Sequence, residues 1–118
     1  MITIRFAQEI ASPLLMNRHN SVIYELHIEG HAGYDDGGKD IVCAGVSALA
    51  HGYAFCIKHM LDERYVVQMV LDPGNTHIQF YVGEWERRDH MKLTVEAFKE
   101  AFLSLQTAYP DNVKVIGA

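Results

Sequence analysis

Apolar and polar residues alternate along two segments near the start of the chain, residues 2–7 and 21–31. An alternation with a period of two predicts β-strands that bury one face. The apolar positions that would share a buried face are Ile2, Ile4 and Phe6 in the first segment and Val22, Tyr24, Leu26 and Ile28 in the second. Strict alternation along the second strand places His31 on the opposite, polar face, away from the core.

Apolar residues return at helical spacing in two longer segments, 41–62 and 88–108. This spacing predicts two helices, each with one buried stripe. The predicted stripes are Val46, Leu49, Tyr53, Ile57 and Met60 in the first helix and Met91, Val95, Phe98, Phe102 and Leu105 in the second. Pro110 ends the second helix, because proline cannot continue a helical hydrogen-bond pattern.

The remaining predicted strands are 65–71, 76–82 and 112–116. The sequence Asp-Pro-Gly-Asn at 72–75 strongly favours a turn. We therefore expect strands 65–71 and 76–82 to pair with each other. The element order ββαββαβ predicts a single α+β domain over residues 1–118, a two-layer sandwich of two helices and a mostly antiparallel sheet. Segment 8–20 is interpreted as a long connection between the first two strands. Its apolar residues 13–16 are interpreted as covering part of the core rather than forming a binding site.

The composition narrows the class of protein. The 118 residues are 49% hydrophobic and 21% charged, which is ordinary for a soluble globular domain. We expect a cytoplasmic protein that contacts no membrane, because no apolar run long enough to span a bilayer and no signal-like start are evident. The net charge of −5 disfavours nucleic-acid binding and fits a basic protein partner, although such a charge can equally serve solubility alone.

The two cysteines, Cys43 and Cys56, lie 13 residues apart (56 − 43) on the first predicted helix. They are therefore about 20 Å apart at 1.5 Å per residue, too far for a disulfide. Two unpaired thiols favour a reducing compartment.

Cys43 has the sequence context of a reactive thiol. Asp40 is a good N-cap for the first helix, which puts Cys43 in its first turn. A helix N-terminus and a nearby imidazolium both favour the thiolate, and His31 could act as general acid or base. His31 would need a bend at Gly30 to reach the helix. The alternative is that Cys43 is a small buried apolar residue, the interpretation we prefer for Cys56.

Other residues near the thiol have candidate roles. The backbone N–H groups of Val42 and Cys43 are the natural oxyanion donors, and Ser47, one turn further along, could donate a hydrogen bond. Asp40 could instead orient His31, although capping is the simpler role.

We expect no metal and no cofactor. His27 and His31 would lie about 13 Å apart along a strand, too far to share a metal ion. The other histidines show no zinc-like spacing: His19, His51, His59, His77 and His90.

A resemblance to a known family rests on several short strings. They are Gly30-His31-Ala32, then Gly38-x-Asp40-Ile41-Val42-Cys43-Ala44-x-Val46-Ser47-Ala48, Ser104-Leu105-Gln106-Thr107, and the start Met1-Ile2-Thr3. Together they resemble the signature of the Prp family of ribosomal-processing cysteine proteases over nearly the whole chain. The connection 8–20 is longer than the short hairpin of that family.

The resemblance implies a cytoplasmic homodimer that removes a short N-terminal extension from a basic large-subunit ribosomal protein, number twenty-seven. Cys43 would be the nucleophile and His31 its partner, and the loop 32–39 would order around the substrate. Gly38, Asp40, Val42 and Ser47 are then the expected substrate-binding or oxyanion residues. Two alternatives use the same residues: a non-enzymatic ribosome-assembly module that holds the same basic N-terminus, and a thioesterase or acyltransferase.

Overall fold

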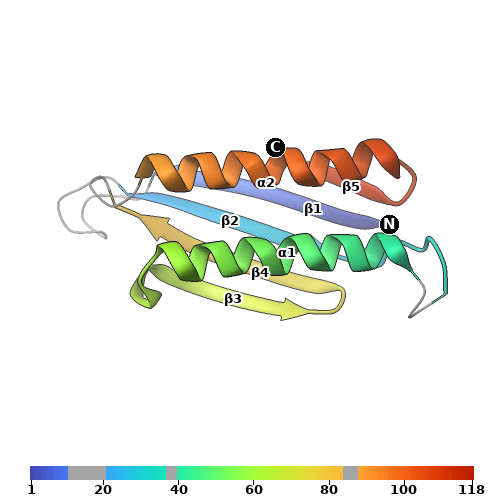
Figure 1. The fold of residues 1–118 in the computed structure, drawn as a ribbon, viewed down its shortest axis with the longest axis horizontal. Coiled ribbons are helices and arrows are strands. Elements are labelled where there is room, and N and C mark those ends of the chain that lie inside the picture. The colour runs from blue at the N-terminus through green and yellow to red at the C-terminus, as the bar shows by residue number, and fades with distance from the viewer. Residues whose placement is uncertain (11–20, 37–39, 84–87) are drawn as a thin grey trace.

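Two long helices cover one face of a five-stranded sheet (Figure 1). The computed structural model describes residues 1–10, 21–36, 40–83 and 88–118, and every structural statement below concerns these residues. The elements in chain order are β1 (Ile2–Ile10), β2 (Val22–Glu29), α1 (Ile41–Met60), the 3-10 turn η1 (Glu63–Tyr65), β3 (Val66–Asp72), β4 (Asn75–Val82), α2 (Arg88–Ala108) and β5 (Val113–Ile116).

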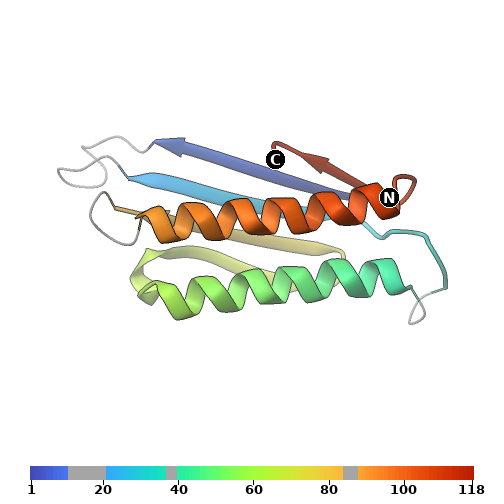
Figure 2. The same ribbon diagram turned by 45° about the horizontal axis from the view of Figure 1, so that its top comes forward.

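The strands are ordered β3-β4-β2-β1-β5 across the sheet. Neighbouring strands are antiparallel except β5, which pairs with β1 in parallel. The predicted order ββαββαβ and the two-layer α+β sandwich with a mostly antiparallel sheet are thus confirmed (Figure 2).

The core lies between the sheet and the helices, where the alternating apolar residues of β1, β2 and β4 meet the helical stripes. Tyr53 of α1 is 1% exposed and packs edge-on against Phe6 of β1 and Phe80 of β4. Burial raises the pKa of the Tyr53 hydroxyl far above its usual value, so the ring stays neutral. Of the predicted stripe positions, the half-buried ones are Leu49, Met60, Phe98 and Leu105.

Several element ends differ from the predictions. β1 continues to Ile10, which pairs with Val22, so residues 8–10 are strand rather than connection. The reason is the long antiparallel partner, which supplies hydrogen bonds beyond the clear apolar alternation. The apolar residues 13–16 lie outside the described residues. α1 ends at Met60 instead of residue 62, because Asp62 caps the following turn η1.

The expectation that no segment is long and apolar enough to span a membrane is wrong for α1. By length and composition this helix would qualify, as core helices of folded domains often do. It packs on the sheet through a stripe of residues buried in the core: Val42, Val46, Ala50, Tyr53, Ala54 and Ile57.

Several chain segments meet at one end of the sandwich. The start of α1, the end of β2, the β3–β4 turn and the turn between α2 and β5 all lie there (Figure 1). This end carries the candidate site.

Candidate active site

A bend at Gly30 turns His31 toward the helix layer. β2 ends at Glu29, and Gly30 has a φ of +94°, a left-handed conformation that favours glycine. His31 therefore leaves the alternation of the strand and lines a groove together with Cys43. Its expected position on the polar face is wrong because β2, and with it the strict alternation, ends at Glu29, two residues before His31.

Gly30 is also held tightly by its neighbours. Its N–H donates to the carbonyl of Gly74 in the β3–β4 turn at 3.1 Å. A Cβ added at Gly30 would lie 2.5 Å from the carbonyl oxygen of Met1. Close packing and backbone conformation both require glycine here.

Asp40 places Cys43 in the first turn of α1. One carboxylate oxygen of Asp40, Oδ1, accepts hydrogen bonds from the N–H groups of Val42 at 3.0 Å and Cys43 at 2.9 Å. The prediction that Asp40 caps the helix is confirmed. The other oxygen, Oδ2, accepts from the N–H of Tyr34 at 3.1 Å, so Asp40 also ties the chain after His31 to the helix.

All three of these bonds join the Asp40 carboxylate to backbone N–H groups, and none of them involves His31. They also occupy the N–H groups of Val42 and Cys43. An oxyanion role for those two groups remains a prediction, and it would require Asp40 to release them. The side chain of Val42 is buried in the core, so only its main chain could take part.

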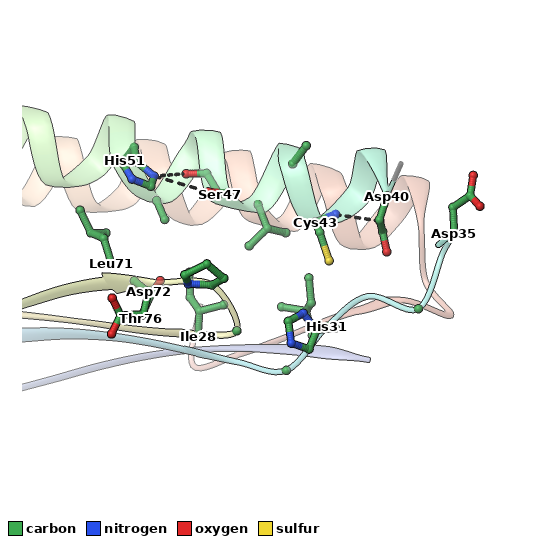
Figure 3. A pocket seen from close by; sticks show the side chains of 18 residues that line it. Ile28, His31, Asp35, Asp40, Cys43, Ser47, His51, Leu71, Asp72 and Thr76 are labelled. Atoms are coloured by element: carbon green, nitrogen blue, oxygen red, sulfur yellow. Dashed lines mark hydrogen bonds between the residues drawn. The ribbon is translucent and has the colours of Figure 1, made fainter. Parts of the chain in front are cut away.

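The sulfur of Cys43 points from α1 toward the segment that carries His31 (Figure 3). The N–H of Ala32 donates to Cys43 Sγ at 3.2 Å, a contact that strengthens when the sulfur is negatively charged. The ring of His31 rests against the β3–β4 turn, where a Cβ added to Gly74 would lie 2.9 Å from His31 Nε2. Among the described residues no hydrogen bond joins this ring to the thiol, an arrangement common in active sites without substrate.

A groove of about 580 Å³ opens beside the thiol, between α1 and the β3–β4 turn. Its apolar lining is Ile2, Ile28, Ala44, Val46, Ala50, Leu71 and Pro73. Two exposed carboxylates, Asp35 and Asp72, also line it. The groove can thus accept apolar groups and favours positive charge.

Ser47 and His51 continue the helix side of the groove beyond Cys43 (Figure 3). His51 Nδ1 lies 2.8 Å from the carbonyl oxygen of Ser47 and 3.5 Å from its hydroxyl. The N–H on Nδ1 therefore donates to that carbonyl, which leaves Nε2 available. Sequence reasoning missed His51 as a site residue, although its spacing of four from Ser47 and eight from Cys43 puts all three on one helix face.

Gly38 of the predicted site lies outside the described residues. Histidines away from the groove include His27 and His77, which face each other across β2 and β4 and pair with Glu29 and Glu25. In the described ranges no group of three or more His, Cys, Asp or Glu side chains could hold a metal ion.

Comparison with known proteins connects this geometry to a family. The family model described as "Cysteine protease Prp" matches residues 13–114, a range that includes both His31 and Cys43. The chain belongs to the Prp family of cysteine proteases.

Two curated Prp relatives are similar along most of their length. The ribosomal processing cysteine protease Prp of Bacillus subtilis (strain 168) is 26% identical over 98 residues, which cover 82% of this chain and 88% of the relative. Its counterpart in Staphylococcus aureus (strain NCTC 8325 / PS 47) is 25% identical over 93 residues, covering 79% and 85%.

Two solved Prp structures share the fold. The S. aureus Prp with a covalently linked product peptide has a TM-score of 0.70 at 22% identity, and 98% of each chain is covered. The S. aureus Prp with a substrate peptide has a TM-score of 0.65 at 23% identity, covering 98% of this chain and 97% of that one.

Because Asp40 caps α1 through its carboxylate, we expect this Prp family member to lose stability in acid. The N–H of Cys43, more than that of Tyr34, holds the pKa of Asp40 below its ordinary value of 3.8, against a smaller opposing effect of burial. A depressed pKa stabilises the fold above pH 3.8, and this contribution disappears as the pH falls through the folded-state value. Urea unfolding from neutral pH to about pH 3 should therefore show the wild type losing stability relative to Asp40→Asn only at the acid end. Parallel pH curves for the two proteins would contradict the assignment.

Proposed function

We propose that this chain is a cysteine endopeptidase that removes the N-terminal extension of a basic large-subunit ribosomal protein, number twenty-seven, with Cys43 as nucleophile and His31 as general acid and base. The observation that carries the proposal is that these two side chains line one groove, Cys43 from α1 and His31 from the segment after β2. The membership of the Prp family and the printed names of its ribosomal-processing relatives support the substrate.

The proposed reaction has two steps. The Cys43 thiolate attacks the carbonyl carbon of the scissile peptide bond, and an S–C bond forms. As the C–N bond breaks, the imidazolium of His31 gives its proton to the leaving amine. Water then attacks the thioester, His31 takes a proton from that water, and the released sulfur returns to the thiolate.

The rest of the groove supplies support for binding. Its apolar lining can hold side chains next to the scissile bond, and the carboxylates of Asp35 and Asp72 suit a basic protein, as does the net charge of −5. Ser47 is well placed to donate a hydrogen bond to a peptide lying along α1.

The proposal also includes the cellular location, the oligomeric state and the partners of the protein. Cytoplasmic location agrees with the two free cysteines, and a homodimer follows from the resemblance alone. We assign no nucleic acid and no membrane partner.

Incubation of the purified protein with the full-length ribosomal precursor, followed by intact mass spectrometry, tests the proposal. We expect one cut that removes the N-terminal extension, and no cut in a precursor that lacks the extension. Binding without cleavage would support the assembly module instead, and turnover of acyl thioesters without peptide cleavage would support an acyltransferase or thioesterase.

A further inference from the structure

The backbone of Ala32 is held on both sides, and one of these bonds ends on the candidate nucleophile. Its N–H donates to Cys43 Sγ at 3.2 Å, and its carbonyl accepts from the side-chain amide of Asn112 at 2.9 Å. Ala32 is 2% exposed, so water cannot readily replace either partner. Asn112 is 80 residues away in the sequence (112 − 32).

Asn112 is itself a fixed anchor. It lies in the turn between α2 and β5, where its N–H donates to the carbonyl of Tyr109 at 3.0 Å. Its own carbonyl accepts from the N–H of Ile2 at 2.9 Å. The side chain therefore extends from a backbone that is bonded to Tyr109, the residue after α2, and to the first residue of β1.

Beyond Ala32, the segment is tied to the start of α1 by the hydrogen bond from the N–H of Tyr34 to Asp40 Oδ2 at 3.1 Å. The next residue, Gly33, has a φ of +67°, and a Cβ added there would meet no heavy atom within 4 Å. Packing at Gly33 thus does little to fix the chain. One further contact comes from the same turn as Asn112: the ring of Tyr34 lies edge-on to Tyr109 at 5.3 Å.

We propose that Asn112 is a positioning residue for the nucleophile: by holding the Ala32 carbonyl, it keeps the Ala32 N–H directed at the sulfur of Cys43. The proposal rests on the proposed role of Cys43. Asn112 acts through Ala32, and the Ala32 N–H is the group in contact with the reacting atom. A fixed donor holds the sulfur in one orientation before substrate arrives, which avoids reorganisation during attack.

Asn112→Ala and the isosteric Asn112→Asp test this role. The first removes the donor, and the second points a carboxylate at the carbonyl oxygen. We expect kcat for peptide cleavage to fall about tenfold or more, further for Asn112→Asp, with KM within about twofold. The rate at which iodoacetamide alkylates Cys43 should fall as well, because the nucleophile itself is affected.

The chain offers two matched controls. Gln106→Ala breaks a similar bond at the same junction, from Val115 N–H to Gln106 Oε1, but leaves Ala32 untouched. Cys56, half-buried on the same helix, reports within each variant whether α1 remains folded. We expect Gln106→Ala to keep kcat and Cys43 alkylation near wild type, and Cys56 alkylation to stay constant in every variant.

Two results would overturn the proposal: Asn112 variants with wild-type kcat and Cys43 alkylation, or equal losses in the Asn112 and Gln106 variants. If Asn112→Ala does not fold, Asn112→Asp retains the shape of the side chain and carries the test. The alkylation measurement needs no substrate, so it distinguishes failure of this proposal from failure of the proposed peptidase activity.

Discussion

Replacing Cys43 by alanine should lower cleavage of the ribosomal precursor by at least about a thousandfold, with the fold intact. The variant lacks the atom that forms the thioester, and no other thiol lines the groove in the part of the chain that the structure describes. The nearest hydroxyl on this helix face, Ser47, lies one turn away, and its histidine partner is His51 rather than His31. Among the described residues, the half-buried thiol accepts one backbone hydrogen bond, from the N–H of Ala32, so the free energy of unfolding should change by only about 1 kcal/mol.

Single-turnover cleavage with enzyme in excess, followed by mass spectrometry, measures the loss, and urea unfolding measures the stability. Cys56→Ala is the matched control, because it removes the other thiol of the same helix. It should keep activity within about twofold. Undiminished cleavage by Cys43→Ala would falsify the nucleophile assignment.

The order of elements could be predicted because each buried face requires apolar residues at regular intervals along the sequence. The apolar positions of β2 alternate, and those of α2 repeat at helical spacing, so both elements were located closely. Element ends were harder to locate. The last residues of β1 are exposed and pair with β2 through the backbone, which any side chain permits.

The candidate site was predicted only in part. Asp40, Cys43 and Ser47 are close in sequence and lie on one helix, so helical geometry was enough to relate them. Asn112 could not have been found, because its bond to Ala32 depends on how α2 and β5 meet β1. The occupied N–H groups of Val42 and Cys43 follow from the cap, yet sequence reasoning assigned the same groups to an oxyanion.

The position of His31 depends on the positive φ of Gly30, which cannot be predicted from the pattern of apolar and polar side chains. Gly30→Ala should therefore damage both stability and activity. An alanine at a φ of +94° is strained, and its Cβ would lie 2.5 Å from the Met1 carbonyl, a backbone atom with little room to move. We expect a loss of about 2–4 kcal/mol in the free energy of unfolding, measured by urea titration.

Relief of that clash must shift either the start of β1 or the chain that leads to His31, so kcat should fall well beyond what the unfolded fraction explains. Gly33→Ala is the control, because Gly33 also has a positive φ, +67°, but has open space where a Cβ would be. Its cost should be limited to backbone strain of about 1–2 kcal/mol. Equal losses of stability in the two variants would show that the close contact with Met1 does not matter. A Gly30→Ala enzyme with wild-type kcat would show that the bend does not position His31.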